Sequence, residues 1–256
     1  VTRWHQLDLA GQLLQLAKDD PTADQWVVFS LPAIAEGQLM DCDPRQPGEP
    51  LWPDKFPLED LLKTKVTAGT YGWASLYQQR PTTPEGTILN REWWKYYRQM
   101  PAKFDRQILS WDCTFKDTKG TDYVVGQVWG QVAADKYLLD QVRARMDFPT
   151  TINAVLNLAA KWPMARAKLI EDKANGPAVI ATLKRKVPGL IPINPEGGKV
   201  VRAWGVSPDI EAGNVYLPEG KPWAHDFVEE CADFPTGAHD DQVDAMSQAI
   251  NYLNNS

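Results

Sequence analysis

Apolar residues in the second half of the chain recur in short runs separated by turn residues, a pattern typical of strands that alternate with helices. Three strand patterns follow Pro101, and helical patterns then alternate with further short strands. The predicted strands are residues 107–112, 122–130, 136–143, 168–171, 190–193 and 215–217. The predicted helices are residues 150–161, 177–186, 198–212 and 240–253. The order predicts an antiparallel hairpin pair that leads into parallel strands, with helices on both faces of the sheet.

The first hundred residues follow a less regular pattern. Their predicted elements are helices at residues 4–18, 56–64 and 71–79 and a strand at residues 25–30. Five prolines make residues 41–57 an irregular connection. No catalytic constellation stands out here, so we expect residues 1–100 to be a mostly helical connecting or docking region. We place the boundary of the second domain, residues 101–256, after it.

Composition narrows the class of protein. At 256 residues, with 43% hydrophobic and 23% charged residues, the chain has the composition of a soluble globular protein. It contains no apolar run of 18 residues and no signal-peptide pattern, so neither a membrane span nor secretion is indicated. The three cysteines are scattered and lack CxxC spacing. This argues against a zinc site or a disulfide scaffold and fits a reducing cytosol.

Charge is unevenly distributed. The net charge of −6 argues against a uniformly basic nucleic-acid-binding surface. Residues 161–202 nevertheless carry nine Lys or Arg against three Asp or Glu, whereas residues 203–256 carry ten acids and one Lys. A phosphate-binding flank beside a metal site would explain this pattern, and so would two solvated helix faces.

Three acidic clusters carry the candidate chemistry. Asp112 ends one predicted strand and Glu171, followed by Asp172, ends another. The last predicted helix opens with three more aspartates, Asp240, Asp241 and Asp244. Strand ends in one sheet lie close together, and helix positions three or four apart share a face. Clustered carboxylates resist ionisation without a cation, so the pattern indicates a Mg²⁺ or Mn²⁺ site, with two ions about 3.5–4 Å apart serving phosphodiester chemistry.

Each acid taken alone has an ordinary explanation. Asp240 can be a helix N-cap, and the acids after it lie in a first turn where negative charge is favoured. Asp117 and Asp122, in the loop after the first strand, are weaker candidates that turn formation also explains. His239 could contact a phosphate or be a surface turn residue. The combination of three clusters on one fold pattern, a ribonuclease H-like order of elements, favours the metal site.

The basic residues near these acids are candidate phosphate contacts. Lys173, Lys199 and Arg202 could neutralise DNA phosphates, although solvated lysines are common. Residues 194–199 form a polar loop before a predicted helix start, a candidate anion site. The GxxxxGK[ST] phosphate-binding motif is absent, so the sequence shows no nucleotide-hydrolysing site.

These segments resemble the nuclease part of the large terminase subunit of tailed bacteriophages. The resembling pieces are Leu109–Asp112, Gly120–Tyr123, Ile170–Gly176, Gly198–Ala203, Gly213–Pro218 and Phe234–Ala245. Two further pieces, Thr2–Gly11 and Tyr77–Pro81, resemble the end of that family's ATPase domain and the connection that follows it. The likeness therefore spans nearly the whole chain.

The resemblance implies a ribonuclease H-like nuclease that lacks its upstream ATPase domain and cuts concatemeric viral DNA in the host cytoplasm. By its motifs, Asp112 would bridge two metal ions, Glu171 would hold one, and Asp241 or Asp244 the other. Resolvases of the same superfamily carry acids three apart on that helix, which favours Asp241 and Asp244 over Asp240. The double acid Glu171-Asp172 leaves the middle ligand ambiguous, and the five-residue spacing to Gly176 favours Glu171.

The implied partners are double-stranded DNA, the ATPase domain, small terminase and portal, and no membrane. Two other interpretations are weighed against the terminase nuclease. One is a resolvase or integrase of the same fold, which would prefer branched DNA. The other is a docking module that grips DNA or the portal without catalysis, which fits the basic stretch and leaves the acids unexplained.

Overall fold

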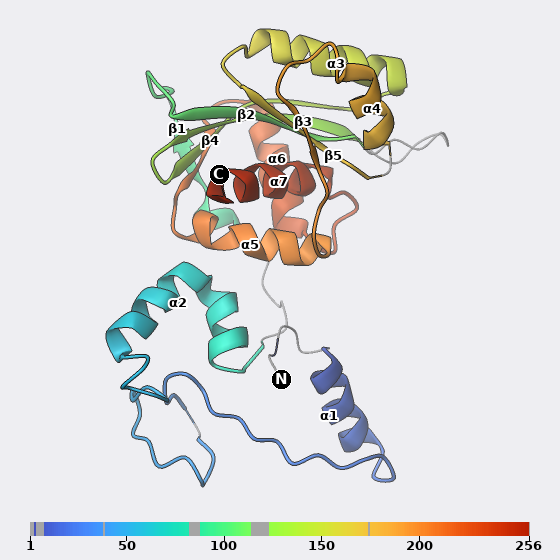
Figure 1. Ribbon diagram of the computed structural model, residues 1–256. Coiled ribbons are helices and arrows are strands. Elements are labelled where there is room, and N and C mark those ends of the chain that lie inside the picture. Colours follow the sequence, from blue (N-terminus) through green and yellow to red (C-terminus); the bar gives the residue numbers. More distant parts are fainter. Residues whose placement is uncertain are drawn as a thin grey trace. The chain divides into compact units, whose positions relative to one another are not determined.

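The chain is described from a computed structural model that covers residues 3, 8–37, 39–81, 88–113, 123–173 and 175–255. It divides into two compact units, Val1–Gly86 and Thr87–Ser256 (Figure 1). The second unit begins before residue 101 because Ile88, Leu89 and Trp94 are buried in its core. Among the sequence candidates, Asp117 and Asp122 lie outside the described residues.

The first unit is mostly helix and irregular chain. Helix α1 (Leu9–Asp19) begins at Asp8, whose carboxylate accepts a hydrogen bond from the backbone N–H of Gly11. Helix α2 (Leu58–Gly72) runs directly into the π-helical turn η1 (Trp73–Tyr77) and bends at Gly69, where φ is 67°. The two helices predicted at residues 56–64 and 71–79 are therefore one longer helical stretch with a kink.

The strand predicted at residues 25–30 was wrong. In the structure these residues are extended, but no neighbouring strand within the described part of the chain pairs with them. Their apolar side chains remain exposed, with Val27 95% accessible. The small core of this unit consists instead of Ile34, Leu61 and Trp73.

The second unit is built on one seven-stranded mixed sheet, with strand order β1-β7-β4-β3-β2-β5-β6. The strands are β1 (Lys95–Tyr97), β2 (Arg106–Asp112), β3 (Val124–Val132), β4 (Asp135–Ala144), β5 (Ala167–Glu171), β6 (Leu190–Ile193) and β7 (Val215–Pro218). The meander β2-β3-β4 is antiparallel, and β5 and β6 run parallel to β2. All six predicted strands of this unit are confirmed, and β1 adds an edge strand parallel to β7.

Helices cover both faces of the sheet. The segments α3 (Phe148–Lys161) and α4 (Gly176–Leu183) lie on one face, whereas α5 (Lys199–Glu211), α6 (Pro222–Asp233) and α7 (Asp241–Asn255) lie on the other (Figure 1). A single 3₁₀ turn, η2 (Arg91–Trp93), precedes β1. The four predicted helices of this unit are confirmed, and α6 is an addition. This mixed sheet between two helical layers is the predicted ribonuclease H-like fold.

The alternation of side chains along the central strands positions the acids. Trp111 of β2 and Ile170 of β5 point into the core under α3 and α4, whereas Ile108 and Leu169 point into the core under α5–α7. The indole of Trp111 lies directly against Gly126 of β3, where a Cβ atom would come within 2.5 Å of the ring. Because successive side chains alternate between faces, the residue after Trp111 and the residue after Ile170 both turn toward α7.

Candidate active site

Asp112 and Glu171 end two neighbouring parallel strands at the same level. The register pairs Trp111 with Ile170, so the next residue on each strand comes at the same edge of the sheet. Adjacent strands lie about 4.8 Å apart, and both side chains turn toward α7. Asp112 is almost fully buried and Glu171 is half-buried. The structure therefore places these two predicted site residues beside each other.

Gly176 explains the spacing that follows Glu171. Any Cβ at this first residue of α4 would lie 1.7 Å from the Glu171 carbonyl oxygen, so only glycine lets the helix start against the strand end. Asp172 lies between them, but its side chain is exposed. Its backbone N–H donates to the Ile193 carbonyl at 2.7 Å, which extends the pairing of β5 with β6. The Glu171 side chain is thus half-buried and turned toward α7, whereas the Asp172 side chain is exposed.

Helix α7 brings the other acids to the same edge. It is fastened to β2 by the Ser110 hydroxyl, which donates to the Ala245 carbonyl at 2.7 Å, and by the Gln248 amide, which donates to the Ser110 hydroxyl at 2.9 Å. Asp241 and Asp244 lie in its first turn and are both buried, whereas Asp240 precedes it and is partly exposed. Helix α7 thus brings Asp241 and Asp244, which follow Asp112 by 129 and 132 positions in the sequence, to the edge of the sheet where Asp112 lies.

The start of α7 is held from the other side by Glu230 of α6. The Glu230 carboxylate accepts hydrogen bonds from the backbone N–H and the side-chain amide of Gln242, each at 2.7 Å. It also pairs with Arg143 of β4 at 2.8 Å. A chain of amides links Gln242 to Gln141 at 2.8 Å and on to Gln127 at 3.0 Å. This buried network fixes the helix terminus that carries the acids.

Two of the predicted DNA contacts form ion pairs with acids of the chain itself. Lys199 Nζ lies 2.7 Å from Asp240 and 3.0 Å from Asp244, and Arg202 donates to Asp244 at 2.6 Å. Burial opposes the charge of Lys199, but its hydrogen bond to Asp240 and the charge of Asp244 raise its pKa above the ordinary value. Lys173, the third predicted contact, is exposed and donates to the Pro195 carbonyl at 3.1 Å. Asp244 is thus neutralised by the chain's own cations.

Two carboxyl groups in the site resist ionisation. Burial raises the pKa of Glu171, and the charge of Asp244 adds to it against the opposing effect of Arg202. Burial, together with Glu230 and Asp240, raises the pKa of Asp241 from 3.8 to about 6, although the backbone N–H of Tyr123 donates to it. The ionised form of each group is therefore penalised in the metal-free protein, and a bound cation would relieve that penalty.

The acids at this edge of the sheet can be compared with what a divalent cation requires. Asp112, Glu171 and Asp241 offer hard carboxylate oxygens of the kind Mg²⁺ and Mn²⁺ bind. Within the described part of the chain, however, no three Asp, Glu, His or Cys side chains converge closely enough to enclose an ion. Asp244 already binds Lys199 and Arg202. These carboxylates have the chemistry that a divalent cation requires. Their side chains must move before they can surround an ion.

A cleft of about 440 Å³ opens beside Glu171. Its wall includes Arg202, Asn194, Gln248, Glu196 and Asn251. The cleft thus lies between the end of β5, the loop before α5 and the outer face of α7. It gives one of the two acids at the strand ends an open approach from outside.

Sequence reasoning missed the residues that support the acids. Arg143 and Glu230 were not singled out, because a charged residue near a strand end or in a polar helix is ordinary. His239 was considered as a phosphate contact. In the structure its ring meets the ring of Tyr123 edge-on at 5.0 Å.

Comparisons with known proteins identify the class. The fold is that of a ribonuclease H-like domain, and the model of the family described as the terminase RNaseH-like domain matches residues 109–253. The chain belongs to this family. The predicted family and fold class are thereby confirmed.

Solved structures agree in fold. The large terminase from a thermophilic bacteriophage matches with a TM-score of 0.60 and 10% identity, over 77% of this chain and 52% of that one. The complex of the same large terminase with ADP matches with a TM-score of 0.59 and 11% identity, over 77% and 52%. The large terminase nuclease from thermophilic phage G20c with bound zinc matches with a TM-score of 0.50 and 15% identity, over 64% and 97%.

The chain spans about half the length of the first of these large terminases. No curated protein sequence matches it. Among the described residues, no helix is long and apolar enough to cross a lipid bilayer.

Proposed function

We propose that this chain is a metal-dependent DNA endonuclease that cuts viral DNA during genome packaging. One observation carries the proposal: Asp112 and Glu171 end adjacent strands in register, and α7 brings the buried Asp241 to the same edge. Membership of the terminase RNaseH-like family supports DNA as the substrate. We further propose low sequence specificity, since no base-reading motif is evident in the sequence.

The proposed metal ligands are Asp112, Glu171 and Asp241, with Mg²⁺ or Mn²⁺, two ions in all, as the cofactor. When bound, such ions activate a water for attack on phosphorus and stabilise the leaving 3′ oxygen. The raised pKa values of Glu171 and Asp241 imply that both carboxyl groups release protons as cations bind. Ion uptake should therefore weaken as the pH falls toward 6.

The remaining acids have supporting roles in this proposal. Asp244, bound by Lys199 and Arg202, joins α7 to α5 and keeps two positive charges beside the reacting phosphate. A small movement of either cation would let it contact DNA phosphate as well. Lys173, exposed on the loop after β5, is proposed as a further phosphate contact.

The biological setting follows from the family alone. We propose that the first unit is the end of an ATPase domain and its connection to the nuclease, and that small terminase and portal are partners. The place of action would be the cytoplasm of the bacterial host. A docking module without catalysis is the competing interpretation, and the cations already bound to Asp244 are the observation that favours it.

Plasmid cleavage tests the proposal. Supercoiled plasmid is incubated with the chain in EDTA, Mg²⁺ or Mn²⁺, beside Asp112→Ala, Glu171→Gln and Asp244→Ala. Asp172→Asn is the matched control, since this neighbouring acid is exposed and faces away. We expect metal-dependent nicking or linearisation that falls at least about 100-fold in Asp112→Ala and Glu171→Gln and is retained in Asp172→Asn. No cutting with any metal, together with DNA binding that every variant keeps, would instead support the docking module.

A further inference from the structure

A second charged arrangement lies at the same edge of the sheet and is centred on Tyr123. The guanidinium carbon of Arg143 lies 3.9 Å from the centre of the Tyr123 ring, and that of Arg145 lies 5.0 Å from it. The His239 ring packs edge-on against the same tyrosine. One aromatic ring thus orders two arginines that project from the end of β4.

The two arginines differ in what else they bind. Arg143 is half-buried and donates to Glu230 at 2.8 Å, so its charge is committed to the network that holds α7. Arg145 is exposed, and no carboxylate of the described residues lies within 4.0 Å of its guanidinium. Its positive charge therefore faces solvent, held in position by an uncharged ring.

The register places this arginine relative to the acids. Asp112 of β2 pairs with Val125 of β3, which pairs with Arg143 of β4, so the three lie in one row across the sheet. Arg145 lies two residues further along the chain from Arg143. Two strand spacings and two residues amount to about 12 Å between the Cα positions of Asp112 and Arg145. This distance is short enough for the two residues to contact different phosphates of one DNA duplex.

Tyr123 also touches the acidic site directly. Its backbone N–H donates to the Asp241 carboxylate. The alternation along β3 and β4 turns Tyr123 and Arg145 toward the face that α7 covers, which is the face of Asp112 and Glu171. The arginine and the acids are therefore joined through one residue and share one side of the sheet.

We propose that Arg145, ordered by the ring of Tyr123, binds a backbone phosphate of duplex DNA close to the phosphate that lies at the acids. The inference rests on the proposed function in taking DNA as the ligand. A guanidinium stacked on a ring keeps its N–H fork free for phosphate oxygens, and its ordering reduces the entropy lost on binding. The contact carries no sequence information, so it positions the duplex rather than selecting a site.

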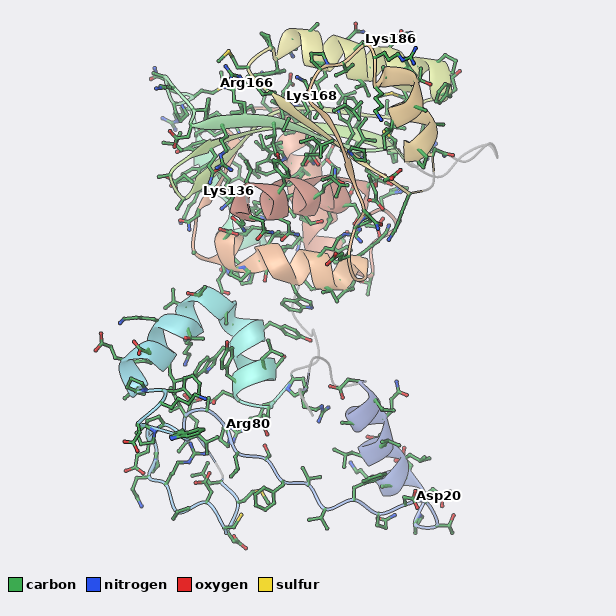
Figure 2. All side chains as sticks on the ribbon, viewed as in Figure 1. Asp20, Arg80, Lys136, Arg166, Lys168 and Lys186 are labelled. Atoms are coloured by element: carbon green, nitrogen blue, oxygen red, sulfur yellow. The ribbon has the colours of Figure 1, made fainter. Side chains whose placement is uncertain are left out.

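DNA binding without cleavage tests the contact. The affinity of the whole chain for a duplex of about 30 base pairs is measured by fluorescence anisotropy in EDTA, at salt concentrations from about 50 to 200 mM. Arg145→Ala is compared with wild type and with Lys186→Ala. Lys186 is also exposed, but it follows α4 beside the layer of α3 and α4, at the opposite end of β5 and β6 (Figure 2). Both variants lose one positive charge.

We expect Arg145→Ala to reduce the slope of log affinity against log salt by about 0.9, the value for one phosphate contact. Its loss of affinity relative to wild type should accordingly be about three- to fourfold greater at 50 mM than at 200 mM salt. Lys186→Ala should leave the slope unchanged. Tyr123→Leu keeps the charge of Arg145 and removes the ring, and it should weaken binding at every salt concentration with the slope retained.

The outcomes separate this inference from the proposed function. Wild-type binding with an unchanged slope in Arg145→Ala overturns the phosphate contact and leaves the nuclease proposal standing. Equal losses in Arg145→Ala and Lys186→Ala overturn it too, because the effect would then be one of net charge. A wild-type chain with no affinity for DNA overturns both.

Discussion

The two buried aspartates of α7 are three residues apart, and only one of them has a cationic partner in the part of the chain that the structure describes. Asp241 is 7% exposed and Asp244 is 4% exposed. Asp244 is held by Arg202 and Lys199 at 2.6 and 3.0 Å, whereas no Lys or Arg nitrogen of the described residues comes within 4.0 Å of Asp241. Asp241 instead has a pKa raised to about 6.

The difference between Asp241 and Asp244 indicates which carboxylate a bound cation would stabilise. A buried carboxylate that the protein itself neutralises contributes to the fold, and one that it leaves uncompensated has a raised pKa and destabilises the folded state when it is ionised. Glu171 behaves like Asp241, with a raised pKa and no ion pair among the described residues. The comparison therefore favours Glu171 and Asp241 over Asp244 as the proposed cation ligands, since Asp244 already pairs α7 with Lys199 and Arg202 of α5.

The largest expected effect comes from the residue that places Glu171. Gly176→Ala puts a methyl group on top of the Glu171 carbonyl oxygen, so strand end and helix start must separate. We expect a loss of about 3 kcal/mol or more in the free energy of unfolding, measured by urea denaturation. Gly198→Ala is the control, since nothing lies within 4 Å of a Cβ there. Equal unfolding midpoints for the two variants would contradict the account of Gly176.

The second largest loss of stability should come from breaking the ion pair between Arg202 and Asp244. Arg202→Met leaves Asp244 buried with Lys199 as its remaining cation, and we expect about 2–3 kcal/mol of destabilisation. Arg91→Met is the matched control, because its pair with Glu229 is exposed on both sides and should contribute less than about 1 kcal/mol. Urea unfolding of both variants checks this. A loss no greater in Arg202→Met than in Arg91→Met would mean that Asp244 is not a structural pair.

The substitution Asp241→Asn should stabilise the protein, unlike the two preceding substitutions. The folded pKa of Asp241, about 6, lies above its ordinary value of 3.8, so the folded state binds the extra proton and loses stability as the pH rises from about 4 to 6. Above pH 6 the metal-free protein carries the whole penalty. We therefore expect Asp241→Asn to stabilise the protein by about 2 kcal/mol at pH 7.5 in EDTA, after allowance for partial solvation, and by little at pH 4. Destabilisation at pH 7.5 in urea titrations would show that Asp241 is compensated in another way.

The smallest expected change in stability comes from the addition of metal. At a free Mg²⁺ concentration ten times the dissociation constant, binding should stabilise the wild type by about 1.4 kcal/mol and raise Tm by about 3–5 °C. The shift should vanish in Asp241→Asn and persist in Asp172→Asn, as differential scanning fluorimetry at pH 7.5 can measure. An equal shift in Asp241→Asn would exclude Asp241 as a ligand.

The sequence predicted most of the second unit because its strands alternate or run apolar between clear turn residues. It missed α6 because His225, Asp226 and Glu229 dominate that segment, and its apolar residues become a stripe only once Phe227 and Cys231 have a core to face. The strand expected at residues 25–30 failed for the converse reason. An apolar run predicts a strand locally, but a strand also needs a neighbour, and none of the described residues provides one.

For the site, the sequence located the acids but not their state of charge. Asp241 and Asp244 share a helix face, and nothing in their spacing indicates that Lys199 and Arg202, from a helix about 40 positions earlier, neutralise only one of them. The same holds for Glu230 and Arg143. Their pairing joins α6 to β4, which are far apart in the sequence, so it is a tertiary property.

The short strand β1 has a practical consequence for anyone who isolates the second unit. It covers the outer edge of β7 in parallel register, and Trp94 just before it packs edge-on against Phe227 of α6 at 5.3 Å. A recombinant fragment that starts at residue 101 would leave the backbone of β7 open on that side and expose the apolar surface under Trp94. Open strand edges recruit other chains, so such a fragment should self-associate during purification, and a start at residue 87 should keep it monodisperse.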